Sequence, residues 1–158
     1  RTSIFDYIGV PNHQRWMNAK KFDGGSLKVE EKELRDFYKT LLNFTLESEA
    51  LMGDYREIHY FNKDHTPGYD HRIFSFVRWT DNEKLIVVSN FDADRTYDID
   101  FKVPEDIIKT WKLENKSYQL NEIFDPGSKH QLHVENGRGI IKLSLEPLES
   151  KIFRIKNE

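Results

Sequence analysis

The sequence contains no cysteine, so neither disulfide bonds nor thiolate metal sites can support its fold. No stretch approaches the roughly 18 consecutive apolar residues that a membrane-spanning helix needs, so we expect no membrane span. Lys and Arg together number 24 against 27 Asp and Glu, and the net charge of -3 gives no general attraction for nucleic acid. These absences exclude three kinds of partner or stabiliser but leave the cellular compartment open.

Sequence signatures of catalysis are also missing. There is no glycine-rich phosphate loop, no G-x-S-x-G nucleophile elbow and no cysteine nucleophile. Asp98 and Asp100 have the separation of an inverting glycosidase pair, but they fall on the polar side of an alternating strand, where nothing apolar would raise either pKa. We therefore expect neither a catalytic residue nor a cofactor in this chain.

Possible metal ligands have unsuitable spacings. His130 and His133 are three apart in an expected strand, which points them to opposite faces. Residues 92–96 imitate the opening of a calcium-binding loop, but Tyr97 stands where that loop requires glycine. We therefore expect no bound metal ion.

One segment of the chain does have helical periodicity. Residues 1–26 contain Pro11 and paired glycines without a sustained period, which predicts a long irregular loop. Residues 29–44 follow with apolar side chains that recur at i, i+3, i+4, i+7 and i+8, which predicts a helix, and a further helical turn is expected at 48–52. The apolar face of the expected helix comprises Leu34, Phe37, Tyr38, Leu41 and Leu42.

Beyond Gly53 the pattern changes to the alternation that is typical of β-strands. Turn signals separate neighbouring strands at 80–83 and at Asn136-Gly137. Short strands with turns between them and no long helix predict a mainly β fold, an antiparallel β-sandwich of about eight strands. The strands are expected at 55–61, 73–79, 85–91, 96–103, 118–124, 132–134, 139–145 and 151–156.

Aromatic residues make up 13% of the chain, including three tryptophans, so sugar binding is a second possible role. Exposed flat rings stack on the apolar faces of sugars. Trp16, Tyr69 and Trp111 fall in segments expected to be loops, and they are the candidate substrate contacts. Core packing is the alternative role for each ring and is favoured for Trp79, because most aromatic residues of a β-sandwich lie in its core.

Six groups of residues along nearly the whole chain carry a resemblance to a known family. The groups are residues 1–7 with Pro11 and Arg15-Trp16, then 34–42, 50–55, 74–78, 85–91 and 145–150. In this order they resemble the carboxy-terminal region of the α-amylase family of glycoside hydrolases. The first group resembles the segment after the eighth barrel strand, the second resembles the last barrel helix, and the third resembles the link into the carboxy-terminal domain. The others resemble strands and the last turn of that domain.

The resemblance implies a Greek-key β-sandwich packed beside a (β/α)8 barrel that hydrolyses, branches or transfers α-1,4-glucans such as starch or glycogen. The family's catalytic residues lie on barrel strands that would precede this chain, so none is carried over to it. We expect residues 1–45 to be the tail of that barrel, a loop and its final helix. Residues 46–158 would be a non-catalytic domain that stabilises the barrel. A starch-binding module is the alternative role.

The expected partners are therefore the catalytic barrel of the same parent chain and α-glucan. In the isolated chain the helical face of Leu34, Phe37 and Leu41 would lack its barrel. Exposed apolar surface of this kind seeks cover, so the face would either fold back on the sandwich or drive self-association.

Overall fold

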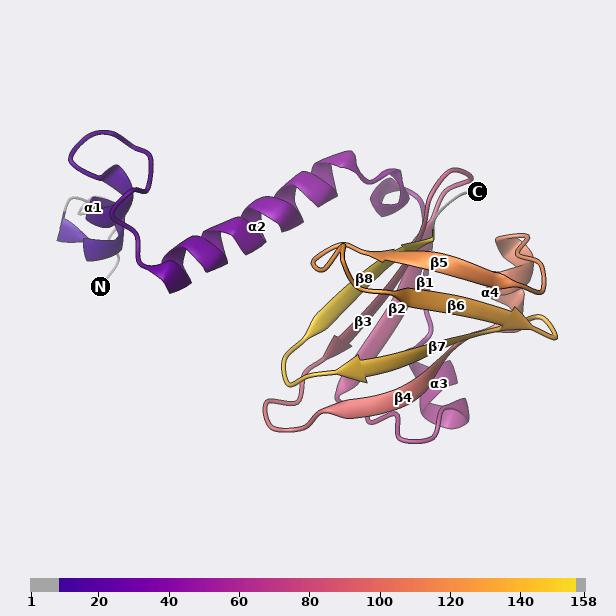
Figure 1. The fold of residues 1–158 in the computed structure, drawn as a ribbon. Coiled ribbons are helices and arrows are strands. Elements are labelled where there is room, and N and C mark those ends of the chain that lie inside the picture. The colour runs from indigo at the N-terminus through magenta and orange to yellow at the C-terminus, as the bar shows by residue number, and fades with distance from the viewer. Residues whose placement is uncertain (1–8, 156–158) are drawn as a thin grey trace. The chain divides into compact units, whose positions relative to one another are not determined.

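A computed structural model of the chain describes residues 9–155. The expectations for residues 1–7 and for the strand end at Lys156 lie outside the described residues. The chain divides into two compact units, residues 1–43 and 44–158. In the described part, the first unit is helical and the second holds the strands (Figure 1).

The first unit begins with a helix that the sequence analysis did not predict. Helix α1 (Pro11–Met17) has proline at its first position, where the missing N–H costs nothing because it would have no helical partner. The helix ends at Asn18, whose φ of 44° is left-handed. The expected irregular loop over residues 1–26 is therefore wrong at α1, because seven residues are too few to show a helical period.

Helix α2 (Val29–Glu47) confirms the expected helix and continues past its expected end at Phe44. Acidic side chains in its first turn suit the positive end of the helix dipole. One of them, Glu31, accepts a hydrogen bond at Oε2 from Arg15 Nε of α1 at 2.9 Å. The paired charges hold the pKa of Glu31 at about 2, mainly through the hydrogen bond from Arg15, and they tie α1 to the start of α2.

A short linker joins α2 to the sheet. The 3-10 helix η2 (Glu49–Met52) confirms the expected turn and ends at Gly53. A Cβ atom at Gly53 would lie 2.0 Å from the carbonyl oxygen of Trp79. Glycine is required here by the close approach of two backbones, since its φ of -89° is accessible to any residue.

Residues 44–155 form one antiparallel sheet of eight strands in the order β1-β2-β3-β8-β5-β6-β7-β4. β5, β6 and β7 are successive neighbours and β8 returns to lie beside β5, which is a Greek key. The predicted mainly β Greek-key fold is confirmed. The strands are β1 (Asp54–Glu57), β2 (Ile73–Trp79), β3 (Lys84–Asn90), β4 (Tyr97–Val103), β5 (Ser117–Glu122), β6 (His130–Glu135), β7 (Arg138–Leu145) and β8 (Ser150–Ile155).

The two layers of the expected sandwich are halves of this single curled sheet. The half made of β5, β6, β7 and β4 lies across the half made of β1, β2, β3 and β8 (Figure 1). The halves are joined where β5 pairs with β8 from Leu120↔Ile155 to Glu122↔Phe153. Side chains on the inner sides form one core, which includes the fully buried Val77, Phe101 and Leu132.

In the second unit, two short helices were not predicted. The expected strand 55–61 is wrong in its second half, because β1 ends at Glu57 and helix α3 (His59–His65) follows. Glu57 Oε1 accepts a hydrogen bond from Tyr60 N at 2.9 Å and thereby satisfies an otherwise unpaired donor in the first turn of α3. Helix α4 (Glu105–Thr110) begins directly after Pro104 with two acidic residues in its first turn. That combination is a helix-start signal.

Both expected turns are confirmed. Asn136 and Gly137 have φ values of 50° and 74°, the positive pair that a tight hairpin turn requires. Thr80 N donates to Glu83 O at 2.9 Å and closes the turn between β2 and β3. Within residues 9–155, no helix has both the length and the apolar character needed to cross a membrane.

Candidate functional site

The three candidate sugar-contacting rings do not come together in the structure. Trp16 lies on α1 and is 38% exposed, so its expected loop setting is wrong. Tyr69 and Trp111 lie outside helices and strands but are only 8% and 4% exposed, inside the core of the second unit. Because protein covers both rings, the structure does not support sugar stacking on either, and Trp16 is the exposed candidate.

The two buried rings have core contacts instead. Trp111 lies edge-on to Trp79, with ring centroids 6.2 Å apart. Tyr69 Oη forms a hydrogen bond with Ser75 Oγ at 2.9 Å, and burial raises the pKa of Tyr69 well above its ordinary value. These contacts match the alternative role as core residues.

In the first unit, Trp16 borders an open groove of about 650 Å³ between α1 and α2. Leu34 and Tyr38, one helical turn apart on α2, form its apolar floor and are 59% and 53% exposed. Asn12 and Arg35 supply polar groups at the same groove. The groove is thus a large apolar surface with a polar margin, confined to the first unit.

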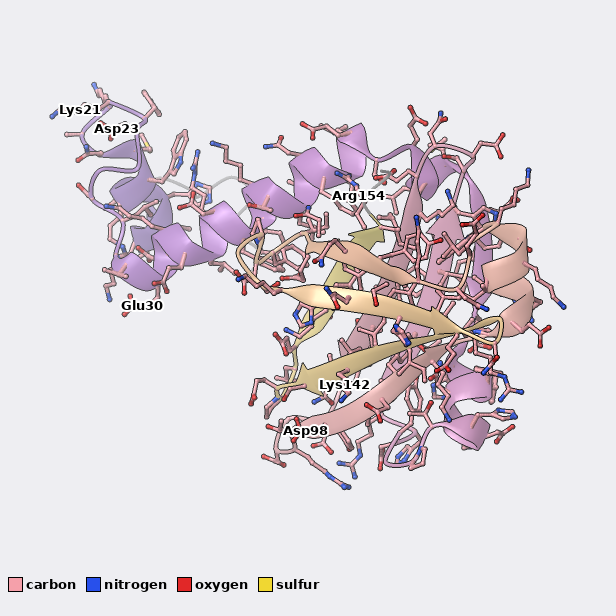
Figure 2. The ribbon with its side chains drawn as sticks, turned by 45° about the vertical axis from the view of Figure 1, so that its right-hand side comes forward. Lys21, Asp23, Glu30, Asp98, Lys142 and Arg154 are labelled. Carbon is pink, nitrogen blue, oxygen red and sulfur yellow. The ribbon has the colours of Figure 1, made fainter. Side chains whose placement is uncertain are left out.

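In the second unit, the outer side of β5, β6, β7 and β4 is a surface that we call the polar face. Asp98 and Lys142 project there from the neighbouring strands β4 and β7 (Figure 2). Both Asp98 and Asp100 are exposed, so no apolar surroundings tune them for proton transfer. The polar face comprises Asp98, Asp100, Lys102, Ser117, Gln119, Asn121, Gln131, His133, Glu135, Arg138, Ile140, Lys142 and Ser144.

The outer side of β1, β2, β3 and β8 has the opposite chemistry, and we call it the aromatic face. Phe76 lies at its centre, with ring centroids 5.5 Å from Tyr55 and 6.0 Å from Phe74. The ring of His59, from α3, lies 5.9 Å from Phe74 and 5.1 Å from Tyr60. The strand residues of the aromatic face are Tyr55, Glu57, Phe74, Phe76, Arg78, Leu85, Val87, Ser89, Ser150, Ile152 and Arg154.

One end of the aromatic face is covered by the joint between α2 and the sheet. Glu83 organises this joint by accepting hydrogen bonds from Ser48 Oγ at 2.7 Å and Ala50 N at 2.8 Å. Arg154 (Figure 2) places its Nε 2.5 Å from Glu83 Oε1 and its guanidinium 5.7 Å from the centre of the Phe44 ring. Burial alone would raise the pKa of Glu83, but the hydrogen bonds and Arg154 outweigh it and lower that pKa.

Within residues 9–155, no three His, Asp or Glu side chains are grouped so as to hold a metal ion. Asp92 instead accepts hydrogen bonds from Asp94 N and Tyr97 Oη, both at 3.0 Å, and pairs with Arg72. These bonds, the one from Asp94 above all, lower the pKa of Asp92. The segment that resembles the opening of a calcium loop is therefore a turn in which donor groups of the protein itself bind the carboxylate of Asp92.

The two histidines of β6 point to opposite sides of the sheet, as their spacing predicted. The ring of His130 packs on the inner side, 5.0 Å from the ring of Phe153. His133 is exposed on the polar face and forms a hydrogen bond through Nδ1 with Ser117 Oγ at 3.0 Å. The pair cannot ligate one ion together.

Comparison with known proteins gives consistent results. Residues 64–156 match the family described as "Alpha amylase, C-terminal all-beta domain". Oligo-1,6-glucosidase of Bacillus cereus is 31% identical over 121 residues, which cover 76% of this chain and 17% of that protein. Crystal structures of AmyP with maltotriose and with maltose share the fold, with TM-scores of 0.55 and 0.52 at 19% and 18% identity.

The similarity concerns a small part of each of these proteins. The AmyP structures align with 83% and 81% of this chain but with only 22% and 21% of their own chains. The chain thus spans between 17% and 22% of the length of the proteins it matches.

Proposed function

This chain belongs to the family of α-amylase carboxy-terminal all-β domains, and we propose that it is the non-catalytic end of an α-glucoside-processing enzyme whose catalytic barrel it stabilises. The names of the relatives support glucosyl substrates for that enzyme, since one is an oligo-1,6-glucosidase and another binds maltotriose. The first name specifies a 1,6-linkage, whereas the resemblance of the sequence implied 1,4-linkages. An assay of the enzyme must therefore offer both, and must separate hydrolysis from branching and transfer.

The observation that carries the proposal is the exposed apolar side of α2. Leu34 and Tyr38 are more than half exposed along the groove of the first unit, and Phe37 is 45% exposed on the same helix. An amphipathic helix normally turns such a face towards a core. The barrel would supply this core if residues 1–45 are its tail.

Turnover by the chain and by the full gene product tests the proposal. We expect the 158-residue chain to release no sugar from maltooligosaccharides or isomaltose, and a longer gene product to do so. Sugar release by the chain alone would contradict the proposal. A gene product that is no longer than this chain would also contradict it.

Substitutions on α2 test the stabilising role in that longer product. Leu34→Asp should lower its melting temperature by several degrees, roughly 3–8 °C, because a charge would enter a buried contact. Thr40→Asp adds the same charge at an exposed position outside the groove and should leave the melting temperature nearly unchanged. Equal effects of the two substitutions would argue against a barrel packed on this face.

In the isolated chain, we propose that the same helix drives self-association through Leu34, Phe37 and Leu41. Light scattering should then give a molar mass above that of the 18.9 kDa monomer, and Leu41→Asp should return it to the monomer value. A monomer in both cases would exclude association through this face.

Sugar binding is the second candidate function, and the exposed Trp16 ring beside Asn12 and Arg35 favours it. If it is correct, the chain is retained on insoluble starch and maltoheptaose changes its tryptophan fluorescence, and both effects disappear in Trp16→Ala. Absence of both effects at millimolar ligand would remove this candidate.

A further inference from the structure

A pocket of the second unit lies where the two edges of the curled sheet meet its short helices. The edge strands are β1 and β4, and each helix follows one of them in the chain and contacts the other. Arg56 of β1 forms an ion pair with Asp106 of α4, and Asn62 of α3 forms hydrogen bonds with the backbone of Lys102 in β4. We call the pocket between them, about 380 Å³ in volume, the seam pocket. Its lining residues are Arg56, Phe61, Pro104, Glu105, Asp106, Lys109 and Arg138.

The seam pocket is separate from the aromatic face and from the groove beside Trp16. In β1, Tyr55 and Glu57 point to the aromatic face, whereas Arg56 lies between them and opposite the buried Val77. Because successive side chains of a strand point to opposite sides, Arg56 lies on the inner side, at the open edge of the sheet. All lining residues of the seam pocket belong to the second unit, whereas the groove belongs to the first.

The half-buried ring of Phe61 gives the seam pocket an apolar side whose position is fixed. The ring of His65 stacks on that of Phe61, with centroids 4.5 Å apart and planes inclined by 18°. His65 Nδ1 donates to Phe61 O at 2.8 Å, and Lys102 Nζ donates to the carbonyl oxygen of His65. A ring that is already held in place loses little conformational freedom when a ligand packs against it.

Charged side chains complete the lining, and most of them form pairs. Besides the pair of Arg56 and Asp106, Lys109 Nζ donates to Glu105 Oε1 at 2.6 Å. The pKa of Glu105 is lowered, mainly by this hydrogen bond and to a smaller extent by the charge of Arg138, so its carboxylate stays ionised at neutral pH. An ionised carboxylate has more lone pairs, and a guanidinium more donors, than one partner uses.

This combination favours an uncharged ligand that carries many hydroxyl groups. Three cations face two carboxylates, and since two of the cations are paired, the pocket has little net charge to attract a phosphate group. Apolar atoms of Phe61 and Pro104 can contact the carbon–hydrogen face of a sugar ring, and the ionised groups form strong hydrogen bonds with its hydroxyls. The volume lies in the range of about 300–1,000 Å³ that is typical of small-molecule sites.

We infer that the seam pocket binds a segment of α-glucan. The inference rests on the proposed function, which supplies the glucosyl class of the ligand. A site of this kind would keep the polymer on the protein without any part in bond cleavage. The rival explanation is that the paired charges only join the helices to the edges of the sheet.

Amide chemical shifts of the 158-residue chain, followed by NMR during addition of maltoheptaose, test the inference. We expect the amides of Phe61, Asp106 and Gly137 to shift together, with half-saturation at about 1 mM, because an open pocket gives weak binding. The same shifts should occur in Trp16→Ala. Unchanged amides around the seam pocket at tens of millimolar maltoheptaose would overturn the inference and leave the rival explanation.

Substitutions on α3 and β7 show whether the lining itself binds the sugar. Phe61→Ala should raise the half-saturation concentration about tenfold, and Tyr60→Ala, which removes the exposed neighbouring ring of the same helix, should leave it unchanged. Arg138→Ala should raise it several-fold, and it replaces Phe61→Ala if far-UV circular dichroism shows that the latter does not fold. Equal binding by Phe61→Ala, Arg138→Ala and the unchanged chain would overturn the inference.

The outcomes separate the inference from the proposed function. If the full-length product releases sugar from α-glucosides but maltoheptaose shifts no amide of the seam pocket, only the inference is wrong. If the seam pocket binds maltoheptaose but the full-length product acts on no α-glucoside, the proposed function is wrong and the sugar site stands. If maltoheptaose shifts only amides near Trp16, or inorganic phosphate displaces it from the seam pocket, the inference is overturned.

Discussion

The two outer faces of the curled sheet are built by the same alternation of side chains, yet one carries aromatic rings and the other carries charges and amides. On β4, inward apolar residues alternate with Asp98, Asp100 and Lys102. On β2, Ile73 and Val77 point inward while Phe74 and Phe76 point outward, so the strand is apolar on both sides. A strand that is apolar on both sides indicates cover on both sides, whereas one apolar side indicates a boundary with water.

The largest expected effect is on both faces at the same time, because both depend on one core. Phe153 of β8 is fully buried beside the junction with β5. Phe153→Ala should destabilise the second unit by about 3–5 kcal/mol, and Phe153→Leu by roughly 1 kcal/mol. Urea unfolding of the chain, followed through the fluorescence of the half-buried Trp79 and the buried Trp111, measures both. A loss of structure confined to one half of the sheet would contradict the single core.

The next effect concerns β4, the edge strand of the polar half. Here the buried side-chain amide of Asn62 forms the hydrogen bonds that a further strand would form. Asn62 of α3 donates to Lys102 O at 2.9 Å, and its Oδ1 accepts from Lys102 N at 2.9 Å and from Thr66 Oγ1 at 2.7 Å. Asn62→Leu should cost about 2–4 kcal/mol, because the backbone groups of Lys102 lose their partner. Lys63→Leu, at the exposed neighbour, should cost little.

Hydrogen exchange locates that loss. The amide of Lys102 should exchange much faster in Asn62→Leu than in the unchanged chain, while amides in β2 and β3 should keep their protection. Uniformly faster exchange over both halves would mean that α3 supports the whole sheet rather than its β4 edge.

A smaller effect belongs to the joint at the end of the aromatic face. Glu83→Gln should cost about 1–2 kcal/mol at pH 7, since the charge that binds Arg154 and the linker is lost. The pKa of Glu83 is lowered on folding, so its charge contributes stability above the unfolded pKa of about 4.3, and this contribution is lost as pH falls through the folded value.

Melting temperatures at pH 7 and at pH 3 check this dependence. The difference between the unchanged chain and Glu83→Gln should be smaller at the lower pH, because the contribution of the Glu83 charge declines below the unfolded pKa and is lost as pH falls through the lowered folded pKa. Glu135→Gln on the polar face is the matched control, with an expected difference within 0.5 kcal/mol, on the order of other surface changes. An equal difference at both pH values would show that the charge of Glu83 does not stabilise the joint.

The smallest effect is expected on the polar face itself. Asp98→Asn and Asp100→Asn should each change stability by no more than roughly 0.5 kcal/mol, because both side chains are exposed to solvent. Sugar release by the full-length product should also be unchanged. A large loss of release, with the melting temperature retained, would give this face a part in the chemistry.

Sequence patterns predicted the long elements well and the short ones poorly. α2 and the strands from β2 onwards were found because each shows its period over several residues. α1, α3 and α4 were missed, since six or seven residues span fewer than two helical turns. Pro at the start of α1 and Pro104 before α4 were available as helix-start signals.

The candidate sugar contacts show that such patterns do not predict how deeply a side chain is buried. Tyr69 and Trp111 were correctly placed outside regular elements, but a loop position does not set depth, and both rings lie in the core. The rings of Tyr55, Phe74 and Phe76 were not singled out, although the apolar character of β2 on both sides was a readable signal of a second covered face.

By itself, the sequence determined that α2 is a helix with an apolar side, that eight strands form, and that tight turns separate them, because these depend on neighbours a few residues apart. Tertiary structure alone decided that β8 joins the two halves into one sheet and that Glu83 forms hydrogen bonds with the linker. It also decided that aromatic rings gather on one outer face. Each of these depends on residues far apart in the chain, whose meeting is set by packing and not by local pattern.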